Sequence, residues 1–277
     1  MKILGIVGPS GSGTTAAVER IVSRLSERGS VATVTHVEGD ALTDGADAVG
    51  TPTADAAEAH WVAEDGSWVA VGEDRTLDDA LATLAPQYDY AVVEGYPDAT
   101  LQTVALGDAE HEGETVATAP DAESVDLAAV VDAVEEQDDF ETLESLVAQV
   151  KRSPDSEYSG AIATFTGRVR TKNGSEDTPT DYLEFERYDG VAEEKMAAIK
   201  SDLEAREGIY EVLLHHRTGV VRREEDIVFV VVLAGHRSEA FETVEDGINR
   251  LKAEVPLFKK EVTVDGEFWA HEPDLVD

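Results

Sequence analysis

The stretch ILGIVGPSGSGTTAAVERIVSRLSERG, residues 3–29, constrains the fold more than any other part of this sequence. It opens with an apolar run of strand length, Ile3 to Val7. After a glycine-rich turn, apolar residues return at helical spacing, and Gly29 marks the end of the expected helix. A buried strand, a glycine turn and a helix form the first part of a βαβ unit, so we expect an α/β domain with a mostly parallel sheet.

The glycine turn fits the spacing of a phosphate loop with one departure. Gly8, Gly13 and Thr15 match G-x-x-x-x-G-K-[ST], but Thr14 stands in the place of the lysine. The backbone N–H groups around the glycines, Gly11 among them, can still meet a phosphate, and Thr15 can still hold Mg²⁺. Because the lysine charge is missing, we expect nucleotide binding without efficient hydrolysis.

One acid belongs with this loop if the strands are arranged as expected. Glu94 ends the apolar run AVVEG, where a metal-binding or water-orienting acid is expected. In so acidic a chain, an ordinary acid at the end of a strand is an equal alternative. The candidate nucleotide-binding residues are therefore Gly8, Gly11, Gly13, Thr14, Thr15 and Glu94.

The remainder of the first half alternates strands and helices. Strands are expected at 30–38, 90–97 and 114–120, helices at 76–87 and 123–137, and a hairpin at 60–72 with its turn at Asp65 and Gly66. The charged segment Glu135–Glu144 reads as a solvated connector. We therefore predict two domains, residues 1–137 and 138–277.

Composition limits the function classes. The chain has 277 residues, with 59 acidic against 22 basic side chains and a net charge of -37, which disfavours nucleic acid and anionic membranes as partners. Salt screens such an excess of charge, which indicates a halophilic source. The absence of cysteine excludes disulfides, thiolate metal sites, cysteine nucleophiles and sulfur carried as a persulfide on this chain. The histidines lack metal-ligand spacing, so no metal site is expected from them. Without a signal-peptide pattern, we expect a cytoplasmic protein.

The second half reads as an α+β domain because long β-prone runs dominate it. Strands are expected at 160–171, 181–189, 211–221 and 226–236, and helices at 190–207 and 238–254. Pro256 stops the last helix, and a further strand is expected after it.

Basic groups gather at the ends of these elements. Strand alternation puts Arg168 and Arg170 on one face. His236 and Arg237 begin a helix, where backbone N–H groups favour an anion, and Lys252 lies near its other end. Each group alone is explained equally well as a surface cation or a partner of the helix dipole. Together they favour a pocket for an anionic ligand.

Four segments resemble, in order, the blocks of the large, catalytic subunit of molybdopterin synthase: GAIATFTGRVR, HHRTGVV, DIVFVVVLAGHRSEAF, and LKAEVPLFKKE with DGEFW. The resemblance covers most of residues 138–277 and implies the α/β hammerhead fold. It implies sulfur transfer to cyclic pyranopterin monophosphate, giving molybdopterin, from the C-terminal thiocarboxylate of a small ubiquitin-like carrier protein. It also implies a homodimer through this domain and no tightly bound cofactor.

The resemblance assigns roles by position. Lys252 and Lys259 match the family's catalytic lysines. The implied substrate-binding residues are Arg168, Val169, Arg170, His236, Arg237, Lys260 and Glu261. One departure is ERYDG, with Arg187, where the family usually has EHYPG.

Residues 1–137 resemble the molybdopterin-guanine dinucleotide biosynthesis protein B family in the phosphate loop and the VEG strand, which implies GTP and Mg²⁺ as ligands. That family's histidine-rich stretch is reduced here to THVEGD, with His36 alone. Two alternatives to a synthase stay open: a GTP-binding protein that assists guanylyl attachment, and a non-catalytic scaffold for cofactor assembly. Lys252 and Lys259 favour the synthase, whereas Thr14 disfavours the GTPase.

Overall fold

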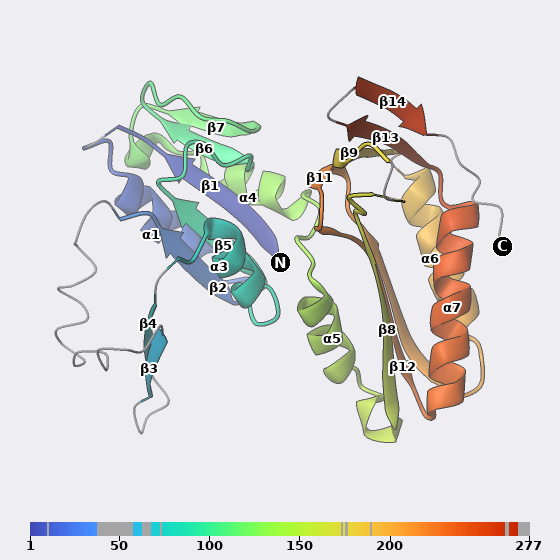
Figure 1. The fold of residues 1–277 in the computed structure, drawn as a ribbon. Helices are drawn as coiled ribbons and strands as arrows, with labels where there is room; N and C mark the ends of the chain where they lie inside the picture. The colour runs from blue at the N-terminus through green and yellow to red at the C-terminus, as the bar shows by residue number, and fades with distance from the viewer. Residues whose placement is uncertain are drawn as a thin grey trace. The chain divides into compact units, whose positions relative to one another are not determined.

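The computed structural model describes residues 1–9, 11–37, 58–62, 68–72, 74–172, 174, 177–188, 190–263 and 266–270. The chain divides into two units, Met1–Phe140 and Glu141–Asp277 (Figure 1). The division lies three residues beyond the boundary that the sequence predicts.

The first unit is built on a parallel five-stranded sheet with the order β2-β5-β1-β6-β7. Its strands are β1 (Lys2–Val7), β2 (Val31–Thr35), β5 (Tyr90–Glu94), β6 (Thr103–Leu106) and β7 (Thr115–Ala119). The predicted parallel sheet is confirmed. Strand β6, a four-residue run among turn residues, was not anticipated from the sequence.

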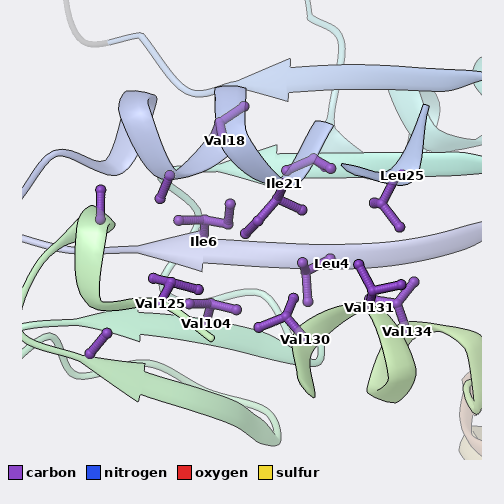
Figure 2. Close-up of a cluster of buried hydrophobic side chains, with 14 of the residues drawn as sticks. Leu4, Ile6, Val18, Ile21, Leu25, Val104, Val125, Val130, Val131 and Val134 are labelled. Atoms are coloured by element: carbon purple, nitrogen blue, oxygen red, sulfur yellow. The ribbon is translucent and has the colours of Figure 1, made fainter. Parts of the chain in front are cut away.

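Helices cover both faces of this sheet. On one face lie α1 (Thr14–Leu25) and α4 (Leu127–Glu135), and Figure 2 shows Leu4 and Ile6 of β1 between them. On the other face α3 (Leu77–Leu84) packs with Ile3, the alternate residue of β1. A fully buried Leu or Ile stabilises the fold by about 1.5–3 kcal/mol. Because neighbouring residues of β1 point to opposite faces of the sheet, a slip by one residue would lose this stabilisation, and the alternation therefore determines which face each helix covers.

The predicted hairpin is present as β3 (Glu58–Val62) paired with β4 (Trp68–Gly72). Its turn residues, Asp65 and Gly66, lie outside the described residues.

The second unit has a three-stranded antiparallel sheet with the order β10-β12-β8. Its strands are β8 (Ala161–Arg168), β10 (Ile209–His216) and β12 (Asp226–Ala234). Helices α6 (Val191–Glu204) and α7 (Arg237–Glu254) cover one face, and α5 (Leu143–Lys151) covers the other (Figure 1). The near-continuous apolar run of β12 follows from this, because Val230 packs toward α6 and α7 and Val231 toward α5.

A second sheet of four strands has the order β11-β9-β13-β14. These strands are β9 (Thr180–Arg187), β11 (Gly219–Arg222), β13 (Leu257–Thr263) and β14 (Gly266–Ala270). The run 211–221, predicted as one strand, is divided between β10 and β11, and Gly219 adopts a φ of 75° at the change of sheet. Two sheets with helices packed on one of them confirm the predicted α+β class.

The segment Glu135–Glu144 is exposed at Glu135, Glu136, Asp138, Asp139 and Glu144, as its charge predicts, but two of its other residues are buried. Thr142 caps α5, and Glu141 is buried although it is charged. The Glu141 carboxylate accepts hydrogen bonds from the Ser145 hydroxyl and, at 2.9 Å, from Gln149 Nε2. These bonds offset the cost of removing the acid from water.

Across the described ranges, none of the helices combines the length and the apolar composition that a membrane crossing requires.

Candidate functional site

The phosphate loop joins the end of β1 to the start of α1. Gly11 and Gly13 have φ values of 87° and 85°, which residues other than glycine rarely adopt. A Cβ on Gly8 would lie 2.3 Å from Ser12 Oγ, so this glycine permits a close approach of the loop to itself. The Ser12 Oγ atom is buried without a hydrogen-bond partner in the structure. The glycines are therefore required by the shape of the turn.

Thr15 and Glu94 meet although 79 residues separate them. The Thr15 hydroxyl donates to Glu94 Oε1 at 2.9 Å, and the Glu94 carboxylate is buried at the end of β5, the neighbour of β1. A hydroxyl beside a carboxylate at the start of a helix suits a Mg²⁺–phosphate ligand. Thr14 supplies no charge, so the loop fits the backbone half of such a site and lacks its cation.

In the second unit, Arg168 is held by two acceptors. Its Nε lies 3.1 Å from Asp226 Oδ1, and its Nη2 donates to the backbone carbonyl of Glu224. Glu224 itself has a φ of 70°, which is uncommon for a residue with a side chain. The guanidinium is therefore oriented, while its side chain stays 60% exposed and accessible to a ligand.

Val169 and Arg170 follow β8 with the predicted alternation, since Arg168 and Arg170 are exposed and Val169 is buried. The Val169 side chain packs in the core under the second sheet, and its N–H and C=O bond to Glu225 and Glu224 at 2.9 and 3.0 Å. Val169 thus supports the two arginines and presents no side chain to a ligand.

Lys259, Lys260 and Glu261 do not share one surface. In β13, Lys259 lies opposite Phe185 and Glu261 lies opposite Leu183, two residues buried under the sheet. Lys260 points to the other face, where its Nζ is 3.7 Å from Glu184 Oε2. The face of Lys259 and Glu261 is called the inner face below. Of the three residues, Lys259 and Glu261 are therefore the pair that can act together.

Helix α7 separates two groups that the sequence placed in one pocket. Arg237 is its first residue and Lys252 lies in its last turn, 15 residues later, which is about 22 Å along the axis. Because α7 runs back along the sheet after β12, Lys252 returns to the end where Arg168 lies, close to β13 (Figure 1). His236 and Arg237 stay at the far end. One copy of the chain cannot bring all these groups around one small ligand.

His216 is a partly buried group next to this site, and its sequence pattern alone does not mark it as functional. Its ring contacts Phe185 edge to face, with centroids 4.8 Å apart, and its Nδ1 lies 2.7 Å from the Arg217 carbonyl. Burial lowers the pKa of His216 to about 4, so the ring is neutral at pH 7. Phe185 pairs with Lys259 on the neighbouring strand, so a neutral, partly buried ring and the candidate catalytic lysine are both neighbours of Phe185.

No described group of three or more histidine or acidic side chains is arranged to hold a metal ion.

The chain matches two protein families in succession. Residues 3–133 match molybdopterin guanine dinucleotide synthesis protein B, and residues 133–254 match the MoaE protein. Among solved structures it is similar to a molybdopterin biosynthesis MoaE protein from Burkholderia ambifaria, with 35% identity, 50% of this chain and 88% of that chain covered, and a TM-score of 0.41. A MobB homolog from Bacillus stearothermophilus shows 21% identity, covers 50% of this chain and 100% of that chain, and has a TM-score of 0.37.

Full-length similarity decides the family. A protein of Haloferax volcanii described as a probable molybdopterin synthase is 50% identical over 276 residues, which cover 98% of this chain and 100% of that protein. The molybdopterin synthase catalytic subunit of Pyrococcus abyssi is 36% identical over 50% of this chain and 89% of its own length. The chain therefore belongs to the molybdopterin synthase family, enzymes of molybdenum cofactor biosynthesis.

Proposed function

We propose that the second unit transfers sulfur from the C-terminal thiocarboxylate of a small ubiquitin-like carrier protein to cyclic pyranopterin monophosphate, giving molybdopterin. The observation that carries the proposal is the gathering of Lys252, Lys259, Arg168 and Arg170 at one end of the second unit. In a chain with a net charge of -37, four cations at one end indicate an anionic ligand. A scaffold would not need them.

The chemistry suits a chain that has no cysteine to carry sulfur. The carrier's sulfur attacks a carbon of the pyranopterin side chain and displaces an oxygen, which takes a proton. Water then releases the carrier as a carboxylate. No electrons are gained or lost, so no redox cofactor is required, and the two sulfurs of the product require two carriers. Lys252 and Lys259 are proposed to stabilise the departing oxygen and to supply its proton.

The test is reconstitution with the purified full chain. Pyranopterin monophosphate and a thiocarboxylated carrier are added in molar KCl, and the dithiolene product is measured. The same carrier with an ordinary C-terminal carboxylate serves as the control. The proposal is wrong if the folded chain forms no product with the thiocarboxylated carrier.

We further propose that the second unit acts as a homodimer. Arg237 lies about 22 Å along α7 from Lys252 within one copy, and His236 lies beyond Arg237, so both ends of α7 can serve one ligand only if they come from two copies. The edge strand β8 is available for this, and the apolar side chains of Ile162 and Phe241 are exposed on β8 and on α7. Two copies related by a two-fold axis would place α7 against its equivalent in the opposite direction.

Mixing two inactive variants tests this arrangement. Lys252→Ala and Arg237→Ala damage different halves of a shared site, so each mixed dimer keeps one intact site of two. Random mixing then restores about a quarter of the wild-type activity. If each site is built from one copy, mixing restores nothing.

For the first unit we propose nucleotide binding with slow turnover. The loop offers backbone N–H groups and the Thr15–Glu94 pair, which suit phosphates and Mg²⁺, whereas Thr14 removes the charge that hydrolysis needs. Calorimetry with GTP and Mg²⁺, followed by a phosphate-release assay, tests both parts. The cofactor prediction depends on this experiment.

A further inference from the structure

Arg187 lies on the same face of the second sheet as Lys259. Strand β9 directs Leu183 and Phe185 to the inner face, and Arg187 continues the same alternation. The register pairs Lys259 with Phe185 and Leu257 with Arg187, without a bulge between them. Arg187 and Lys259 are therefore diagonal neighbours, whose Cα atoms lie about 7–8 Å apart in such a sheet.

The Arg187 side chain is largely buried although it carries a charge. It is 15% exposed, against 22% for Arg250 and 60% for Arg168, two other arginines in ion pairs. A guanidinium stays protonated at every accessible pH, so its burial is costly unless acceptors surround it. One acceptor is Glu193 Oε1 at 3.3 Å, in the first turn of α6. The Glu193 side chain is 59% exposed and can turn away into water.

The residue type at this position strengthens the case, because arginine carries a permanent charge and a planar pair of donors. A buried cation of that kind beside a candidate catalytic lysine has a functional explanation when the ligand is an anion.

We propose that Arg187 is a substrate-binding residue, which anchors the phosphate of the substrate beside Lys259 and exchanges its Glu193 partner for that phosphate. The inference rests on the proposed sulfur transfer, because it takes its anion from that reaction. It adds a residue from β9 to a site otherwise formed by the ends of β8, α7 and β13.

The first experiment compares two arginines of the same sheet. Arg187→Gln removes the charge on the inner face, and Arg222→Gln removes one on the outer face of β11, where Arg222 lies opposite Tyr182. Calorimetry measures the Kd for pyranopterin monophosphate without the carrier, so that no turnover occurs. Losing a charge-assisted hydrogen bond weakens binding about tenfold or more. We expect that loss for Arg187→Gln and less than a twofold change for Arg222→Gln.

The second experiment does not depend on Arg187 tolerating substitution. Glu193→Gln removes the carboxylate that competes for Arg187, and Glu194→Gln removes the next charge of the same helical turn. Both side chains are exposed, so both variants are expected to fold. We expect the Kd for the substrate to fall about twofold to threefold with Glu193→Gln and to change little with Glu194→Gln.

The outcomes separate this inference from the proposed function. If the wild-type chain makes no molybdopterin from a thiocarboxylated carrier, the sulfur-transfer proposal is wrong. If it makes molybdopterin while Arg187→Gln binds substrate as well as Arg222→Gln, the assignment of Arg187 is wrong. Should Arg187→Gln fail to fold, equal Kd values for Glu193→Gln and Glu194→Gln overturn it instead.

Discussion

His216 should make the stability of the second unit depend on pH in a defined window. Burial lowers its pKa from 6.5 to about 4, while the hydrogen bond to the Arg217 carbonyl opposes part of that shift. The unfolded chain therefore binds the proton more readily than the folded one. Stability is complete above pH 6.5 and is lost as the pH falls toward 4.

The two pKa values give the size of the effect. With 6.5 in the unfolded state and about 4 in the folded state, protonation costs the fold about 2 kcal/mol at pH 5 and about 3 kcal/mol below pH 4. At pH 7.5 the cost is negligible. The variant His216→Gln has no titrating group at this position. It loses the ring contact with Phe185 equally at every pH, so its stability does not fall through protonation of this residue.

Urea unfolding of the full chain in molar KCl measures the difference. Unfolding is followed by tryptophan fluorescence. Changing Trp61 and Trp68 to Phe leaves Trp269 as the remaining tryptophan, and Trp269 lies in β14 of the second unit. The free energy of unfolding is compared for His216 and His216→Gln at pH 7.5 and pH 5. The wild type should lose about 2 kcal/mol relative to the variant between these values. Parallel pH profiles would show that the folded state protonates His216 as easily as the unfolded chain does.

Three further predictions concern the sites and the charge. Lys252→Ala and Lys259→Ala should each lower product formation about 100-fold with the fold intact, whereas the control Lys200→Ala, on α6, should not. Near-normal rates for folded Lys252→Ala and Lys259→Ala would remove the catalytic assignment. Thr15→Ala should weaken Mg²⁺–GTP binding and Thr14→Lys should strengthen it, as measured by calorimetry. Equal affinities of both variants and the wild type for Mg²⁺–GTP would exclude the loop as the site. With 59 acidic and 22 basic side chains, the Tm should rise steeply from dilute to molar KCl, and an unchanged Tm would contradict the halophilic interpretation.

The local elements could be predicted because their signals are local. The turn at Gly11 and Gly13 needs positive φ values, and the apolar spacing of α1 follows from its packing on the sheet. Strand β6 was missed because four residues are too few to show alternation. Thr142 and Glu141 were read as solvated because their hydrogen bonds form with Ser145 and Gln149 after α5 has folded.

The candidate site was less predictable because membership depends on where each side chain lies on its strand or helix as well as on the type of residue. Alternation alone separates Lys260 from Lys259, and the length of α7 alone separates Arg237 from Lys252. Both facts were contained in the sequence pattern. Two others were not: the contact of His216 with Phe185 and the register of β9 with β13 join segments that lie far apart in the chain.

The strand order of the first unit has a consequence for synthesis on the ribosome. Strand β1 is made first, but its neighbour β5 pairs Lys2 with Tyr90, which emerges 88 residues later. Strand β5 also lies between β1 and β2, so neither early strand has its partner until β5 has left the exit tunnel. Strand β1 lacks both neighbouring strands during that interval, and its unpaired edges make the nascent chain prone to aggregation. A ribosome-bound chain that ends before Tyr90 should therefore be sensitive to protease throughout its first unit.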